Sequence, residues 1–521
     1  MMKRITYLMA LLAVMVMASC GDSHVDTAKL VPDDAFFVAR IDLMQAGEAS
    51  GVSDNEKLIE KLKKELKKEH VPEDIREKIE EILDEPSESG IDLTEPVYIY
   101  CSLDKRGNPK EAGLVGSVSD DEKLANLLKT VADEANLGDV EEEDGVKYLD
   151  MKAGAVIFTD SWFFAGATEN VDKQIDKLKD RFDGKGSLEG NEAFAKMLEK
   201  KGMVQMLMLG SGLKEMKDMK EADAMLPEGM SWADVAAIVS LSAGNGETAV
   251  TLEVVPMSDG WKKQVAELDK NFGDIDKTMA RYISDEGLAA FVNLNGKSVA
   301  KLLSQAIKLM PRSYGTDDDD LNEIEAIVKR LCNCLEGPII VGIPEMADEE
   351  MPAITAYVNT KDNTIVDFIL EQSEGNDEVR EESEGCYAIP MDYDYSPVYD
   401  QEGDLIDYNI TPSEYMRFGY RNNKTYFVFG DIEPFEEPSK AFDISKLKGK
   451  GLYANFNFKF LNPFIEQMGN ADRQMFGEVL DALDFIELYY DGDGKFVLRT
   501  TTKKKETNPL KVIMETASKM I

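Results

Sequence analysis

The sequence is poor in histidine, the residue on which much nucleophilic and metal-assisted catalysis depends. Among 521 residues there are two histidines, His24 and His70, one near the start of the chain and one in the charged run 67–73. Neither is expected in a folded pocket. Ser-His-Asp and Cys-His catalysis need an imidazole base, and many zinc sites need two or more imidazole ligands. We therefore expect no catalytic residue of these classes, no metal and no cofactor.

Cysteine is also scarce, with five residues at irregular spacing, too few for a disulfide framework. The pair Cys332-Asn333-Cys334 could be a redox or soft-metal pair, but no second pair or ligand histidine accompanies it. We favour two small apolar side chains in the core of a helical segment.

Basic residues are outnumbered, 59 against 100 acidic residues, for a net charge of −41. Such a surface repels nucleic acid and anionic lipid headgroups, so no nucleic-acid partner is expected. Hydrophobic residues make up 43% of the chain, which is enough to bury real cores. The length predicts two to four domains.

The first 20 residues have the layout of a bacterial export signal. Lys3 and Arg4 precede an apolar run from Ile5 to Met17, and Met17-Ala18-Ser19-Cys20 follows. Small residues directly before a cysteine resemble a lipobox, in which the thiol is acylated and becomes the new N-terminus. We expect a signal peptide over 1–19, lipidation at Cys20 and a tether over 20–27. The alternative is an ordinary signal peptide that happens to end in Ser-Cys.

The remaining chain passes twice through one order of expected elements, with offsets of about 240 to 264 residues. Both passes end in a Gly- and Asn/Asp-rich segment, 243–248 or 490–495, that is typical of a hairpin turn. We predict an α+β fold of two related modules, 28–260 and 285–521, joined by a connecting helix over 261–284. Each module is expected to have its own largely antiparallel sheet covered by helices. The matched segments are 36–43 and 289–296, 96–100 and 338–341, 113–120 and 353–360, and 162–166 and 426–430.

The second pass carries an extra segment, 387–420, that is rich in tyrosine and aspartate. Tyrosine combines a rigid apolar face with a polar tip, and nearby carboxylates could bind hydroxyl groups. We predict ligand binding here, against the alternative of a twisted hairpin whose tyrosines pack on the sheet. The candidate binding residues are Tyr393, Tyr395, Tyr399, Tyr408, Asp392 and Asp394.

Two further functions remain open for the acidic residues. Asp392-Tyr393-Asp394 and the run 491–494 offer oxygen ligands for calcium, but neither continues as an EF-hand loop does. A pair of carboxylates could also hydrolyse glycosides, although no pair stands out among 100 acidic residues.

The opening of the expected mature chain, Val31-Pro32-Asp33-Asp34-Ala35-Phe36 and the strand after it, resembles a family of uncharacterised Bacteroidetes lipoproteins known only as a domain of unknown function. The resemblance implies an envelope location and a large α+β ectodomain, and it implies no catalytic residues.

The sequence thus predicts a lipid-anchored cell-envelope protein, at the outer membrane on its periplasmic or outer face. We expect a non-catalytic binding protein with a protein or glycan partner. The alternatives are a carboxylate-dependent glycan hydrolase and a purely structural envelope component.

Overall fold

The computed structural model describes residues 26–520 except 52–58, 61–62, 65, 68–71, 152, 215, 217–218, 225, 228, 273–274, 276, 295, 310–317, 345–352, 374–378, 400–404, 431 and 467. The predicted signal peptide, Cys20 and residues 20–25 of the predicted tether lie outside the described residues. No helix in the described part is long and apolar enough to cross a membrane.

The strands of the described residues are hydrogen-bonded into one antiparallel sheet of 20 strands. The predicted fold class, two modules that each have their own helix-covered sheet, is therefore wrong. Alternating side chains mark a strand, but they do not encode which strand edges meet. An edge strand leaves its N–H and C=O groups unpaired, so it can accept a further strand wherever one is available. Two stretches of sheet can join in this way without any signal in their hydrophobic patterns.

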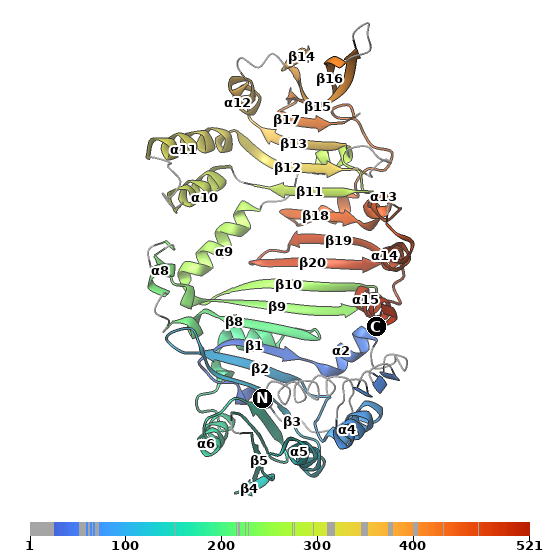
Figure 1. Ribbon diagram of the computed structural model, residues 1–521. Helices are drawn as coiled ribbons and strands as arrows, with labels where there is room; N and C mark the ends of the chain where they lie inside the picture. Colours follow the sequence, from blue (N-terminus) through green and yellow to red (C-terminus); the bar gives the residue numbers. More distant parts are fainter. Residues whose placement is uncertain are drawn as a thin grey trace. The chain divides into compact units, whose positions relative to one another are not determined.

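The chain divides into two compact units, residues 1–265 with 500–521 (unit 1) and residues 266–499 (unit 2). In unit 1 the strands lie side by side in the order β4-β5-β6-β7-β3-β2-β1-β8-β9-β10 (Figure 1). They are β1 (Ala35–Ile41), β2 (Val97–Leu103), β3 (Pro109–Ser117), β4 (Glu141–Glu143), β5 (Val146–Asp150), β6 (Ala155–Phe158), β7 (Trp162–Gly166), β8 (Val204–Leu209), β9 (Val235–Gly244) and β10 (Glu247–Pro256).

In unit 2 the same order of pairing recurs, β14-β15-β16-β17-β13-β12-β11-β18-β19-β20. Here β14 takes the place of β4, and β15 and β16, of 14 and 17 residues, take the place of the much shorter β5 and β6. They are β11 (Leu288–Asn293), β12 (Leu335–Ile343), β13 (Ile354–Thr360), β14 (Arg380–Ser383), β15 (Cys386–Tyr399), β16 (Leu405–Arg421), β17 (Lys424–Phe429), β18 (Leu452–Asn457), β19 (Leu483–Tyr490) and β20 (Lys495–Thr502).

Helices cover parts of the sheet in unit 1. One face packs on α6 and α7, which contribute Ile175, Leu178 and Phe194 to the larger core. A second core forms against α4 and α5, where Ile75, Ile79 and Ile82 recur with helical spacing on one side of α4. The helices are α2 (Leu43–Ser50), α4 (Glu73–Asp84), α5 (Asp121–Ala135), α6 (Val171–Phe182), α7 (Glu192–Leu198), α8 (Met219–Asp223), α9 (Asp259–Asn271, continuing into unit 2) and α15 (Pro509–Met520), which packs on α2 and β10.

Unit 2 has an aromatic core that contains Phe291, Tyr357 and Tyr453, and the ring of Phe442 packs at a tilt of 51° against Phe291, with 4.6 Å between ring centroids. Its helices are α10 (Gly296–Leu309), α11 (Asp318–Asn333), α12 (Thr364–Gln372), α13 (Asn462–Glu466) and α14 (Asn470–Ala482).

Both predicted hairpin turns are confirmed. Asn245 and Gly246 have positive φ angles of 48° and 79° between β9 and β10, and Asp493 and Gly494 have φ angles of 49° and 72° between β19 and β20. These angles are strained for most side chains, which explains the Gly and Asn/Asp residues at these positions.

Candidate binding surface

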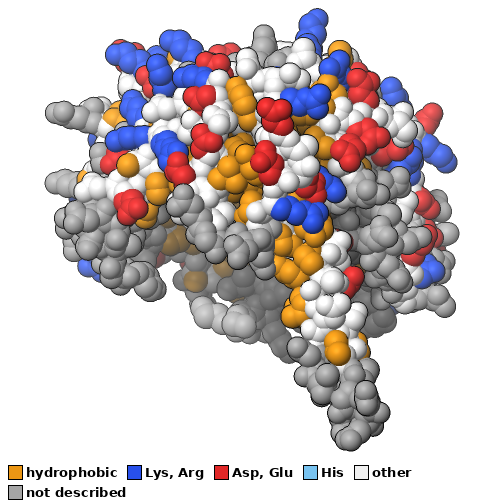
Figure 2. All heavy atoms as spheres, turned by 90° about the horizontal axis from the view of Figure 1, so that it is seen from above, with side chains coloured by type: hydrophobic (Ala, Val, Ile, Leu, Met, Phe, Trp, Pro, Cys, Tyr) orange, Lys and Arg blue, Asp and Glu red, His pale blue; other side chains and the backbone are white. Residues whose placement is uncertain are grey.

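The tyrosine-rich segment forms a long two-stranded ribbon in unit 2. β15 and β16 pair from Cys386 with Gly419 out to Tyr399 with Leu405. The pairing of β14 with β15 stops at Ala388, and that of β17 with β16 starts at Met416. Residues 389–399 and 405–415, here called the arm, thus pair only with each other among the described strands. Figure 2 shows an arm that extends from the body, with hydrophobic side chains along it and at its base.

The register of the arm brings most of the predicted tyrosines together. Residues directly opposite each other in an antiparallel pair lie on the same face. Three successive pairs, Tyr393 with Pro412, Tyr395 with Ile410 and Pro397 with Tyr408, therefore form one continuous surface, here called the tyrosine face.

The other predicted residues of the arm lie elsewhere. Asp394 and Ser396, paired with Thr411 and Asn409, belong to the opposite face. Asp392 lies between two register shifts, and its carboxylate accepts a hydrogen bond of 2.8 Å from the Tyr393 N–H. Tyr399 ends β15 beyond a further register shift, so the alternation does not place it on the tyrosine face.

The tyrosine face is open to solvent. Tyr395, Ile410 and Tyr408 are 63%, 54% and 49% exposed. An isolated two-stranded ribbon is only marginally stable in water, and contiguous exposed apolar side chains usually mark an interaction site. The alternative, tyrosines that pack on the sheet, fits the buried Tyr426 near the base of the hairpin, but not the arm.

The arm is strongly acidic. From residue 389 to residue 415 the sequence has seven Asp and Glu residues and no Lys, Arg or His. No basic residue within the arm offsets the repulsion between these carboxylates.

The acidic residues that we considered as calcium ligands are exposed or have other hydrogen-bond partners in the structure. In the described part of the chain, no group of three or more His, Cys, Asp or Glu residues is placed to hold a metal ion. Asp392 and Asp394 are exposed on a strand. In the second run, Asp491 accepts a 2.8 Å hydrogen bond from Lys495, and the N–H of Asp493 donates to Asp269 at 2.9 Å.

Two buried carboxylates of unit 1, Glu111 and Glu253, form structural ion pairs. Glu111 accepts hydrogen bonds from both Nη atoms of Arg181, at 2.6 and 2.9 Å, and from the Tyr100 hydroxyl at 2.8 Å. Burial alone would raise the pKa of Glu111, but the Arg181 guanidinium and the Tyr100 hydroxyl together lower it to about 2. Lys196 and Lys200 likewise lower the pKa of Glu253 against the effect of burial. A glycosidase acid needs a raised pKa, so these shifts lend no support to the hydrolase alternative.

Cys332 and Cys334 are buried free thiols at the end of α11. Burial raises the pKa of both thiols. A reactive cysteine has a lowered pKa and an electropositive, accessible environment, so the surroundings of these two fit the packing role that we favoured over redox chemistry.

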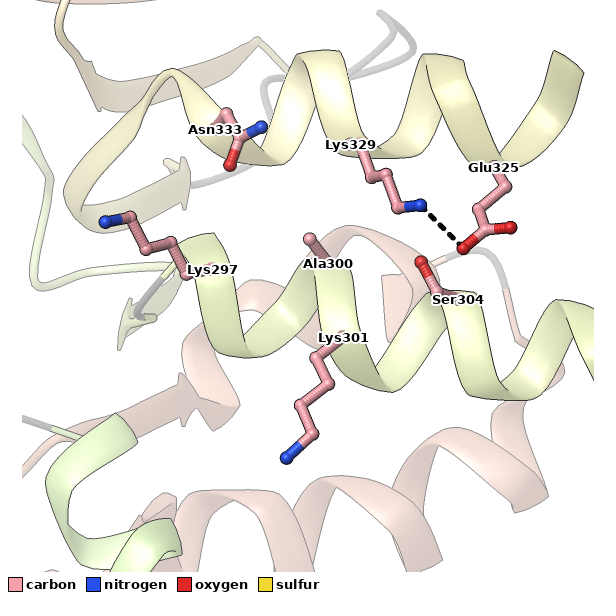
Figure 3. A pocket seen from close by; sticks show the side chains of 7 residues that line it. All are labelled: Lys297, Ala300, Lys301, Ser304, Glu325, Lys329 and Asn333. Carbon is pink, nitrogen blue, oxygen red and sulfur yellow. Dashed lines mark ion pairs between the residues drawn. The ribbon is translucent and has the colours of Figure 1, made fainter. Parts of the chain in front are cut away.

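A cavity of about 480 Å³ lies between α10 and α11 and is lined by three lysines (Figure 3). Lys329 is paired with Glu325 at 2.8 Å, and the side chains of Lys297 and Lys301 point away from each other. The buried Ser304 hydroxyl has no hydrogen-bond partner among the described residues. Because the lysine side chains do not converge, the cavity offers no single point for an anion.

Unit 1 also contains an apolar cavity of about 570 Å³, which was not predicted from the sequence. It lies under Trp232 and Trp261, whose ring centroids are 5.3 Å apart, and against Met208 of β8. The available signal was the methionine-rich stretch 203–230 together with two of the three tryptophans of the chain. Periodicity within a segment cannot show that these residues meet over one sheet face.

Comparison with known proteins identifies a family but no established role. The family described as "Domain of unknown function (DUF4836)" matches residues 28–397. No curated protein matches the sequence. Two solved structures of TP0453 are similar in part: crystal form I (15% identity, 48% of this chain and 87% of that chain, TM-score 0.26) and crystal form IV (18%, 44%, 81% and 0.27). Likeness at this level defines no shared fold.

Proposed function

The chain belongs to the DUF4836 family, and we propose that it is an envelope lipoprotein that binds a basic protein partner through the tyrosine face of its arm. The observation that carries the proposal is the register of the arm, which places Tyr393, Tyr395, Tyr408 and Ile410 on one exposed face. Aromatic side chains with few rotatable bonds lose little entropy on binding and are enriched at the centres of protein interfaces.

The prolines of the arm favour recognition through its face rather than its edges. Pro390 and Pro397 in β15 and Pro412 in β16 have no N–H to donate. Proline on an exposed strand edge blocks the addition of a further strand. A partner is thus expected to pack on side chains and not to extend the sheet.

The charge of the arm favours a protein over a glycan. Tyrosines and carboxylates can also bind sugars, but seven acidic residues over 389–415 without a single base favour cationic partners, and most glycans carry no positive charge. An apolar face within an acidic ribbon matches a protein surface on which Lys and Arg surround hydrophobic side chains.

Photo-crosslinking in living cells tests this proposal. A photoreactive amino acid at Tyr395 probes the tyrosine face, and the same residue at Ser396 probes the opposite face of the same strand. We expect a discrete protein adduct from position 395 and at least tenfold less from 396. Equal yields from both positions would contradict a face-specific site, and a tyrosine-dependent adduct with glycan alone would contradict a protein partner.

A second pair of variants tests the charge argument. Changing Asp394, Asp407 and Glu414 to Asn or Gln should lower the adduct yield, and raised salt should weaken capture by the wild type because exposed charges are screened. Glu141→Gln, Glu142→Gln and Glu143→Gln in β4 remove the same number of acidic residues from unit 1 and should leave the yield unchanged.

The lipid anchor rests on the sequence around Cys20 and has its own test. Lipidated protein should sediment with membranes, and the Cys20→Ser variant should not, because one thiol carries the anchor. Equal membrane association of both forms would refute lipidation at this residue.

A further inference from the structure

One face of the sheet in unit 1 is hydrophobic across five strands. The register of β2, β1, β8, β9 and β10 aligns three rows of five residues, and all fifteen are hydrophobic. At a strand spacing of about 4.8 Å this surface is about 19 Å wide. The rows are Val97-Ile41-Val204-Leu241-Val250, Ile99-Ala39-Met206-Val239-Leu252 and Cys101-Phe37-Met208-Ala237-Val254.

This face is only partly covered. Val97 and Ile41 belong to the core that α4 and α5 cover. Met208, on the interior strand β8, is 42% exposed, and Leu252 of β10 is 39% exposed. Exposed apolar surface of this extent is unusual in a folded unit and usually marks a binding site.

Three residues of the third row, Met208, Ala237 and Val254, form part of the floor of the apolar cavity, to which β8 and β9 also contribute Leu209 and Ala236. Residues of η5 (Trp232–Asp234), α8 and the start of α9 complete much of its lining. All 13 residues that line the cavity are hydrophobic or glycine. The volume of about 570 Å³ falls within the roughly 300–1,000 Å³ of small-molecule sites.

The two tryptophans of the cavity present apolar surface only. The indole N–H of Trp232 donates to the carbonyl of Ala222 at 3.2 Å, and that of Trp261 donates to the carbonyl of Ser231 at 2.8 Å. Because both donors are already used, neither ring offers a hydrogen bond to a ligand.

We propose that this cavity binds a long acyl chain. A charged or peptide ligand would leave polar groups buried without partners, at a cost of several kcal/mol each. The floor strands β8 and β9 each pair with a strand on both sides, so a peptide cannot add to them. An unbranched hydrocarbon chain needs no polar partner and can follow the flexible methionine surface.

The acyl chain can come from two sources. One is the predicted lipid on Cys20, which is six residues before Asp26, the first described residue. Six extended residues span at most about 20 Å. The other source is a fatty acid or a membrane lipid that the protein takes up.

A fluorescent fatty acid tests the site. All three tryptophans lie in unit 1, and Trp162 is buried in the larger core and is not among the residues that line the cavity. Dansyl-undecanoic acid added to the Cys20→Ser protein should bind saturably and quench Trp232 and Trp261 by energy transfer. Palmitate should displace it.

Two matched variants locate the binding. Met208→Asp places a carboxylate in the cavity at an exposed position, so the fold should persist, and affinity should fall at least tenfold. Leu252→Asp introduces the same charge on the same face outside the lining and should change affinity less than threefold. A third variant, Ala237→Phe, narrows the cavity and should shift the preferred competitor to shorter fatty acids.

The lipidated protein distinguishes the sources. If the lipid on Cys20 occupies the cavity, the lipidated form should bind the probe at least tenfold more weakly than Cys20→Ser. If the ligand is external, both forms should bind equally. Absence of saturable binding by Cys20→Ser, or equal losses in the Met208 and Leu252 variants, would overturn the proposal. The arm takes no part in this experiment, so failure of either proposal leaves the other standing.

Discussion

The buried cluster of Glu111, Arg181 and Tyr100 joins β3, α6 and β2 in unit 1, and its removal is predicted to destabilise that unit strongly. We consider Glu111→Gln, which keeps the shape of the side chain and removes its charge. Tyr100 can still donate to the new amide oxygen, but the Arg181 guanidinium, whose side chain is 9% exposed, loses its buried counter-charge.

The magnitude follows from the pKa of Glu111. Its fall from 4.5 to about 2 corresponds to about 3 kcal/mol of folding free energy at neutral pH. Breaking a buried ion pair by removing one partner costs about 3–5 kcal/mol. We therefore expect Glu111→Gln to lower the free energy of unfolding by about 3–5 kcal/mol at pH 7.

The same pKa sets the pH dependence. Because the folded-state pKa is lowered, the contribution is fully present above the unfolded-state value near 4.5 and is lost as pH falls towards about 2. The difference in stability between wild type and variant should therefore be constant from pH 8 to 6 and shrink steadily below pH 5.

Urea unfolding followed by tryptophan fluorescence measures this difference, because all three tryptophans lie in unit 1. The exposed Glu142→Gln serves as the control and should change stability by less than about 1 kcal/mol. A loss below 1 kcal/mol at pH 7, or a difference that stays the same down to pH 3, would refute the reasoning.

Three further predictions concern other parts of the fold. Asp120 caps α5 by accepting from two backbone N–H groups at 3.1 and 3.0 Å, so Asp120→Ala should cost about 1 kcal/mol in urea unfolding and Asp120→Asn much less. The Tyr453 hydroxyl donates a hydrogen bond to the buried Glu487 in unit 2, so Tyr453→Phe should lower the free energy of unfolding by about 1.5–3 kcal/mol. Circular dichroism measures this loss, because unit 2 has no tryptophan. An unchanged melting curve would argue against this bond. Burial raises the pKa of Cys332 and Cys334, so iodoacetamide at pH 8 should alkylate them at least tenfold more slowly in the native protein than in urea. Peptide mass spectrometry measures the two rates, and equal rates would contradict the burial of these thiols.

Several local features of the fold follow from sequence patterns. The hairpin turns at Gly246 and Gly494 were predictable because few residues tolerate positive φ. The alternation in 387–420 and its tyrosine content predicted either a binding segment or a hairpin packed on the sheet, and the segment forms a hairpin whose outer part is exposed. Which tyrosines share a face was not predictable, because register shifts around Asp392 and before Tyr399 interrupt the alternation.

The sequence by itself determined the composition-based expectations: an acidic chain, little histidine, a candidate lipobox at Cys20 and an arm without basic residues. Only the tertiary structure decided that the strands form one sheet, since edge pairing is a contact between backbones that carries no side-chain signature. It also decided the apolar cavity, because Met208, Ala237 and Val254 come from three different strands. Each strand has an ordinary hydrophobic pattern, and only their register turns these patterns into one continuous surface.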